Sequence, residues 1–168
     1  MKPIVYVGFT TSPDIISRLI RAVTHDKVSH VFLAWRDPNF ECVMTIGANF
    51  NGVTMQPLDM MLEDFPVLWS GPRDLWPGIL ANKGLINKPY GYAHLLGMFI
   101  VEAEEHLLGR ISQHNVFTSA RVICSEYVCM ILRSAGYDVL TGRDPGTIDP
   151  GDLEDCVKDL LFAHVSPQ

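Results

Sequence analysis

The chain has 168 residues, of which 48% are hydrophobic, and it carries a formal net charge of -6 at pH 7. This length and apolar content are typical of one domain with a core of its own. No long run of Lys and Arg occurs, which argues against nucleic acid or an anionic membrane as the main partner.

No stretch approaches the roughly 20 apolar residues of a membrane-spanning helix, and the apolar run after Met1 is too short for a secretory signal. The four cysteines lack CxxC or Cys/His zinc spacing, so neither a disulfide framework nor a metal site is expected. We therefore expect a soluble, cytoplasmic protein with reduced thiols. The cysteines are Cys42, Cys124, Cys129 and Cys156.

The first half of the chain predicts mainly strands. Ile4 begins a strand over 4–9, and Ser12-Pro13-Asp14 then gives a cap, a proline and an acidic first turn for a helix to about residue 24. Asp37-Pro38-Asn39 and Asn51-Gly52 are turn signals between extended segments. These segments cover residues 28–36, 40–48, 53–56 and 66–69, with a brief helix over 57–62.

The second half predicts mainly helices. The Gly- and Pro-rich segment 70–88 predicts loop with about one helical turn near 78–83. Helices are then predicted over 90–111, over 124–135 with Gly136 as the stop, and over 153–160. Strands early and helices late predict a single α+β domain over residues 1–168.

Cys124 lies where the helix 124–135 begins. The unpaired N–H groups and the positive dipole end of a helix start favour the thiolate, which is the nucleophilic form. His30 lies in the apolar strand 28–36, and a helix-start cysteine facing a strand histidine is an arrangement that makes a thiol nucleophile. The alternative is a buried, inert thiol and a core histidine.

Taken in order, several stretches resemble the circularly permuted branch of the NlpC-like, papain-fold cysteine amidases and peptidases, which includes YiiX-type and YaeF-type proteins. In that branch the histidine strand precedes the cysteine helix, as His30 precedes Cys124 here. The resemblance implies a papain-like fold with an antiparallel sheet packed against helices. The matching stretches are Ser29-His30-Val31, Gly47-Ala48 with Gly52-Val53, Lys88-Pro89-Tyr90-Gly91-Tyr92, Cys124-Ser125-Glu126-Tyr127-Val128 and Thr147-Ile148-Asp149-Pro150-Gly151-Asp152-Leu153.

The resemblance implies that Cys124 is the nucleophile and His30 its base. The family commonly places a third, carboxylate-bearing residue where this chain has Gly47. Thr45 and Asn49 share the face of Gly47 at period 2 and are candidates to orient the imidazole. Glu41, on the same parity at the far end of the strand, a water and a backbone carbonyl are further alternatives.

Glu126 is expected to cap its helix, with a role as third catalytic group as the alternative. Tyr90 and Tyr92 flank a helix entry, where packing is the plain reading; the resemblance makes them a wall of the substrate cleft.

The expected activity is hydrolysis of amide bonds through a thioester acyl-enzyme, without a metal or organic cofactor. The resemblance suggests peptides, peptidoglycan-type peptides or acylated amines as substrates. Three alternatives stay open: a lipid acyltransferase or thioesterase of the same fold, a catalytically inactive binding module, and a scaffold within an assembly. Replacement of the carboxylate by Gly47 favours an inactive module.

Overall fold

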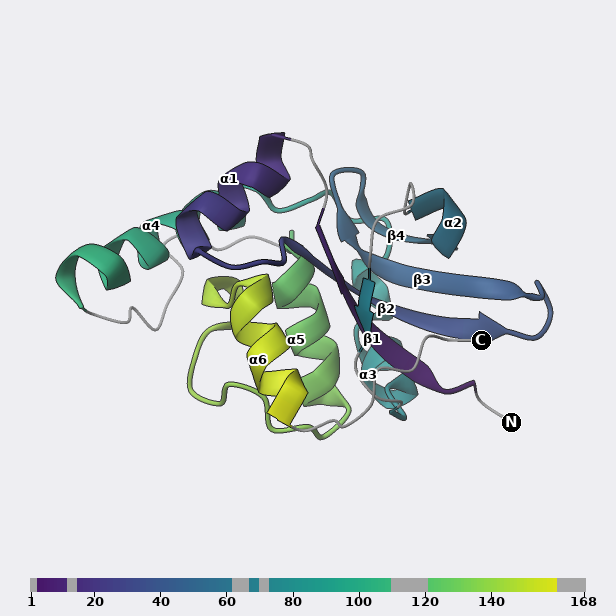
Figure 1. Cartoon of the computed structure of the whole chain (residues 1–168). Coiled ribbons are helices and arrows are strands. Elements are labelled where there is room, and N and C mark those ends of the chain that lie inside the picture. Colours follow the sequence, from purple (N-terminus) through teal and green to yellow (C-terminus); the bar gives the residue numbers. More distant parts are fainter. Residues whose placement is uncertain (1–2, 12–14, 62–66, 70–72, 110–120, 160–168) are drawn as a thin grey trace.

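The computed structural model describes residues 3–11, 15–61, 67–69, 73–109 and 121–159 and confirms the α+β class (Figure 1). The strands are β1 (Val5–Thr10), β2 (His30–Asp37), β3 (Cys42–Asn49), β4 (Gly52–Pro57) and β5 (Val67–Trp69). The helices are α1 (Ile15–Thr24), α2 (Leu58–Met61), α3 (Trp76–Ala81), α4 (Tyr92–Leu108), α5 (Cys124–Ser134) and α6 (Pro150–Asp159), with short 3-10 turns η1 (Lys83–Leu85) and η2 (Pro145–Thr147).

The strands form one antiparallel sheet in the order β4-β3-β2-β1-β5. Phe9 of β1 pairs with Val31 of β2, and Ala34 of β2 pairs with Thr45 of β3. The predicted extended segment 53–56 is a full partner of β3, because the turn ahead of it allows the chain to reverse. Gly52 in that turn has φ +104, a conformation that glycine adopts without strain.

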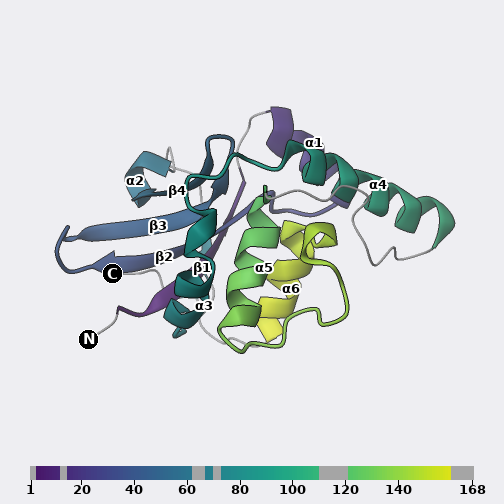
Figure 2. The same ribbon diagram turned by 180° about the vertical axis from the view of Figure 1, so that it is seen from behind.

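One face of the sheet carries the core. Val7, Val31 and Ile46 are fully buried there together with Tyr127 and Ile131 of α5. Helix α5 lies between the sheet and α6, as both views show (Figures 1 and 2). The sheet therefore holds the start of α5 at a fixed place, which is where the candidate nucleophile lies.

Helix α1 packs against α4, which reaches away from the sheet (Figure 2). The predicted helix over 90–111 begins only at Tyr92, because Tyr90 forms a parallel β-bridge with Val122 and the Gly91 N–H donates to the Val122 carbonyl (3.0 Å). The predicted end of this helix at 110–111 lies outside the described residues. None of the described helices combines the length and apolar character needed to cross a bilayer.

Two helices of the second half are present but begin earlier than predicted. Residues 76–81 form helix α3, since Pro77 fits the first turn and Leu75 and Ile79 are buried in the core. Helix α6 begins at residue 150 rather than 153, because Asp149 caps it: the Asp149 carboxylate accepts the Asp152 N–H (2.7 Å). The predicted helix cap at 12–14 lies outside the described residues.

Candidate active site

Cys124 is the first residue of α5, and it is buried with 3% of its surface exposed. The sulfur lies within hydrogen-bonding range of the backbone N–H groups of Val31 and Ser125 and of the Tyr90 hydroxyl. The pairing of β2 with β3 runs from Leu33 to Asp37, so the backbone of Val31 lies beyond that ladder. The sheet and the helix start thus meet at the sulfur.

The electrostatic balance at the sulfur differs from the sequence-based expectation. Burial raises the pKa of the Cys124 thiol, although the N–H groups of Val31 and Ser125 and the hydroxyl of Tyr90 act to lower it. Burial prevails because it removes the water that would solvate a thiolate. Burial, followed by the neighbouring thiol, also raises the pKa of Tyr90 well above its usual range. The thiol therefore needs a nearby base to ionise near neutral pH.

His30 is the first residue of β2 and directly precedes Val31, whose N–H faces the sulfur. Its ring lies on the side of the strand that carries Phe32: the two ring centroids are 6.0 Å apart and the planes differ by 22°. The structure thus brings the backbone next to His30 to the Cys124 sulfur, while the imidazole packs along Phe32. The predicted role of His30 as the base stays a prediction.

At Gly47, the position expected to carry a carboxylate, the side chain of Phe32 leaves little space for a larger residue. A Cβ added to Gly47 would lie 3.1 Å from the Cβ of Phe32, which is tighter than ordinary packing. Phe32 in turn packs edge-on against Trp69, with ring centroids 5.6 Å apart. A larger residue at position 47 therefore requires Phe32 to move, which explains locally why the chain has glycine there.

The other candidate orienting residues have partners within the β3–β4 pair. Thr45 donates to the carbonyl of Gln56 (2.8 Å). The Asn49 amide donates to the Thr54 hydroxyl (2.9 Å) and its carbonyl oxygen accepts the Asn51 N–H (2.9 Å). Asn49 nevertheless lines the same cavity as His30, so of these two it is the one placed closer to the candidate base.

Glu126 contacts His94, a pairing that the sequence analysis missed. Its carboxylate lies 2.8 Å from Nδ1 of His94 and also accepts the Ile123 N–H (3.2 Å), which confirms the capping role. Burial raises the pKa of Glu126, with His94 acting in the opposite direction. His94 lies in the first turn of α4 and is buried. The pair therefore joins the starts of α4 and α5 next to Cys124.

A cavity of about 340 Å³ opens where β1 and β3 end and β2 begins, near α1 and α2. His30 and Tyr90 both line it, so the cavity adjoins the residue that contacts the sulfur. Tyr92 is 51% exposed and is not among the described residues that line the cavity; its hydroxyl donates to the Phe50 carbonyl (3.4 Å), and its ring packs against Tyr90. Of the two tyrosines, therefore, only Tyr90 lines this cavity.

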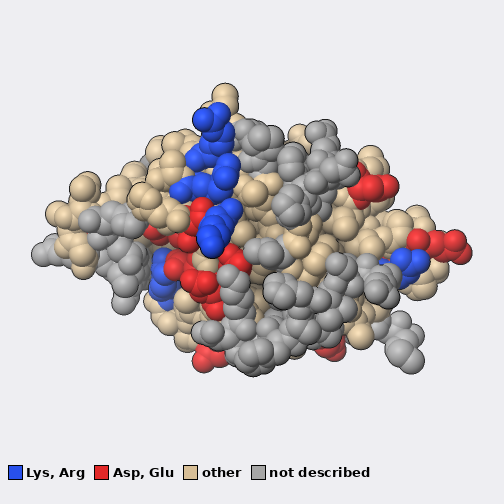
Figure 3. All heavy atoms as spheres, viewed as in Figure 1, with Lys and Arg blue, Asp and Glu red and all other residues tan. Residues whose placement is uncertain are grey.

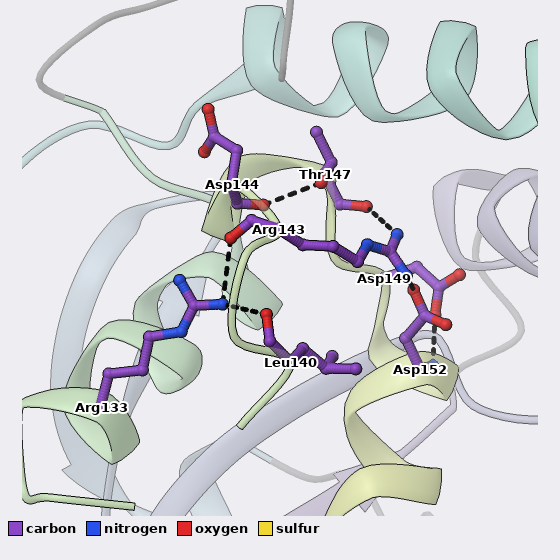
Figure 4. Close-up of polar contacts among 7 residues, drawn as sticks. All are labelled: Arg133, Leu140, Arg143, Asp144, Thr147, Asp149 and Asp152. Carbon is purple, nitrogen blue, oxygen red and sulfur yellow. Dashed lines mark hydrogen bonds and ion pairs between the residues drawn. The ribbon is translucent and has the colours of Figure 1, made fainter. Parts of the chain in front are cut away.

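The loop between α5 and α6 is held by two arginines. Arg133 donates to the carbonyls of Leu140 (2.6 Å) and Arg143 (3.0 Å), as Figure 4 shows. Arg143 donates to the Thr147 carbonyl (2.8 Å) and pairs with Asp152 (2.6 Å). These bonds fix the loop that presents the acidic end of α6.

Carboxylates gather at that end. The carboxylate oxygens of Glu102, Asp149 and Asp152 lie within 4.8 Å of one another, and Asp26 packs against Gly151 and hydrogen-bonds Asp149. Burial raises the pKa of Asp149 to about 8, with the neighbouring carboxylates adding to the shift. Figure 3 shows acidic side chains over α6 beside basic side chains over α1. A cation could fit this spacing, but Asp152 already has a cationic partner within the chain.

A comparison of the chain with protein-family models and with curated proteins gives no match. The function is therefore inferred from the residues of the site themselves.

Proposed function

We propose that the protein is a cysteine hydrolase of the permuted NlpC-like, papain-fold type, which cleaves amide bonds through Cys124. The observation that supports this most is the position of the sulfur. It lies at a helix start, beside the backbone N–H that follows His30, and in contact with Tyr90. His30 and Tyr90 line one cavity, and Tyr90 also contacts the sulfur, so the cavity adjoins the candidate nucleophile through Tyr90.

In the proposed reaction, the imidazole of His30 takes the proton of the Cys124 thiol, and the sulfur attacks the carbonyl carbon of the amide. The C–N bond breaks, the amine leaves with the proton returned by His30, and a thioester remains on Cys124. Water, giving its proton to His30, then hydrolyses the thioester to a carboxylic acid and the free thiol. No cofactor is needed for this sequence.

The developing oxyanion needs hydrogen-bond donors close to the sulfur. The backbone N–H groups of Val31 and Ser125 and the Tyr90 hydroxyl already surround the sulfur, so they are the candidates. The same donors favour the thiolate once His30 has taken its proton. The raised pKa of the resting thiol is consistent with a nucleophile that is activated by a base rather than stored as a thiolate.

The test is the relative rate at which the cysteines react with chloroacetamide at pH 7.5, measured by peptide mass spectrometry. Cys42 and Cys156 are partly exposed whereas Cys124 is buried, so accessibility alone predicts that Cys124 reacts more slowly than both. An activated Cys124 reacts first, and His30→Ala slows it about tenfold or more. The matched control is His25→Asn, an exposed histidine with φ 60 that asparagine tolerates. Labelling of Cys124 that is slower than that of Cys42 and Cys156 and independent of His30 would contradict the proposal.

The second candidate is a non-catalytic binding module of the same architecture. The observation that favours it is the packing of Phe32 against Gly47 and along the His30 ring, where the resemblance places a carboxylate. If the protein is such a module, we expect that Cys124→Ala leaves ligand binding unchanged and that no thioester forms. The labelling experiment separates the two candidates, because a binding module has no reason to activate Cys124.

A further inference from the structure

The cavity beside His30 and Tyr90 has a size that limits what it can hold. Its volume of about 340 Å³ lies at the small end of ligand pockets in proteins. At roughly 30 Å³ for each water-sized group, it accommodates about ten non-hydrogen atoms. A short acyl group with its carbonyl therefore fills it, whereas a longer ligand has to extend past its mouth.

The cavity is uncharged away from its reacting end. Among the described residues that line it there is no Asp, Glu, Lys or Arg, and Tyr90 is the lining residue that contacts the candidate nucleophile. The nearby Arg21 does not line it and directs its Nε to the Ser17 carbonyl (3.4 Å). A charged ligand group buried there would lose its hydration without gaining an opposite charge, which is costly.

Two of the serines that line the cavity have hydrogen-bond partners within the protein. The hydroxyls of Ser17, Ser29 and Thr11 hydrogen-bond to one another in a closed set, and Ser17 and Ser29 are buried. These two serines do not require polar groups from a ligand, because their hydroxyls already have acceptors.

The remaining lining includes apolar side chains. Ile20 of α1 is buried, and Met61 of α2 is partly buried. Phe50 and Met60 also line the cavity and are exposed, so they lie at its mouth. The lining thus offers hydrophobic contact from its inner part to its mouth.

We propose that this cavity binds the acyl part of the substrate, and that this part is uncharged and apolar over about its first ten non-hydrogen atoms. The inference rests on the proposed function in taking His30 and Tyr90 as the end where the carbonyl lies. The acyl chain then extends along Ile20 and Met61 toward the mouth. An acylated amine fits this description, whereas a peptidoglycan-type peptide with a free carboxylate or ammonium near the scissile bond does not.

The test is the binding of three amides of equal chain length to the Cys124→Ala variant. Binding is measured by isothermal titration calorimetry, which requires no turnover. The three are octanamide, 8-aminooctanamide and the monoamide of suberic acid. Octanamide is expected to bind about tenfold or more tightly than either charged amide. Equal or tighter binding of a charged amide, or no binding of any of the three, overturns the proposal.

A pair of variants locates the site. Met61→Lys places a cation in the lining. It is expected to weaken the binding of octanamide about tenfold and to strengthen the binding of the anionic amide. Met55→Lys is the matched control, because Met55 is 47% exposed on β4 and does not line the cavity. Equal effects of the two substitutions overturn the assignment of this cavity.

Hydrolysis of N-octanoyl-p-nitroanilide by the wild-type protein separates this inference from the proposed function. Selective binding of octanamide without hydrolysis of the anilide would support the acyl site and contradict the proposed chemistry. The opposite outcome is hydrolysis that depends on Cys124 and shows no preference among neutral and charged acyl groups. That outcome would support the proposed chemistry and contradict the acyl site.

Discussion

Replacing Asp149 by Asn changes one buried titratable group at the start of α6 and keeps its capping function. The Asp149 carboxylate accepts the Asp152 N–H (2.7 Å), and an asparagine oxygen can accept the same bond. Burial raises the pKa of Asp149 from 3.8 to about 8, and the nearby carboxylates of Asp152, Asp26 and Glu102 add to this shift. The native state therefore holds a proton that the unfolded chain releases near its ordinary pKa.

The direction and size of the effect follow from proton linkage. Because the native state binds more protons than the unfolded state between about pH 4 and 8, this group makes the free energy of unfolding fall as the pH rises through that range. A shift of about 4 pKa units at about 1.4 kcal/mol each sets an upper bound of about 6 kcal/mol. Arg143 pairs with Asp152 and offsets part of the repulsion, so we expect about 2 to 4 kcal/mol.

The assay is urea unfolding at pH 5 and pH 8.5. At pH 5 the free energy of unfolding of the Asp149→Asn variant is expected to be close to that of the wild type, and at pH 8.5 it is expected to be higher. The variant should therefore lose less stability than the wild type between pH 5 and pH 8.5. Asp138→Asn, which changes an exposed carboxylate in the loop after α5, is the control. An unchanged pH dependence, or an Asn variant that is less stable at pH 8.5, refutes the reasoning.

Three further substitutions test the site and its support. Tyr90→Phe removes a donor to the sulfur, so the pKa of Cys124 should rise further and the midpoint of its alkylation–pH profile should move to higher pH; a downward shift contradicts this. Glu126→Gln removes the charge opposite His94 and should cost about 1 to 3 kcal/mol in urea unfolding at pH 7, whereas unchanged stability means that the pair contributes nothing. A Cβ at position 78 meets the carbonyl of Ile131, so Gly78→Ala should destabilise by about 1 to 3 kcal/mol or more, with Gly84→Ala, which faces open space, within about 0.5 kcal/mol of the wild type; equal effects contradict the packing.

The sheet and the longer helices could be predicted because their residues repeat at the spacing of the element. The strands of the first half and α5 appear within a few residues of the predicted bounds. The start of helix α3 at Trp76, two residues ahead of the predicted turn near 78–83, could not be predicted, since six residues show less than two turns of periodicity and the helix is stabilised by core contacts of Leu75 and Ile79. The early start of α6 depends on the side-chain cap from Asp149, which lies ahead of the predicted helix 153–160.

The candidate site was predictable only in part. A cysteine at a helix start can be recognised from local pattern, and the structure places Cys124 there. The net pKa shift of its thiol cannot be predicted from local pattern, because burial is a property of the whole fold. The contact of Tyr90 with the sulfur and the Glu126–His94 pair join residues more than thirty positions apart. Neither has a sequence signal beyond the residue types.

The nucleophilic role of Cys124 is tested most directly by trapping the acyl-enzyme. The wild-type protein is mixed with p-nitrophenyl octanoate, quenched in acid and analysed by intact-mass and peptide mass spectrometry. We predict one octanoyl group, located on Cys124, which accumulates about tenfold or more slowly in His30→Ala. An octanoyl group on Cys42 or Cys156 instead, or a rate that does not change in His30→Ala, contradicts the proposed chemistry.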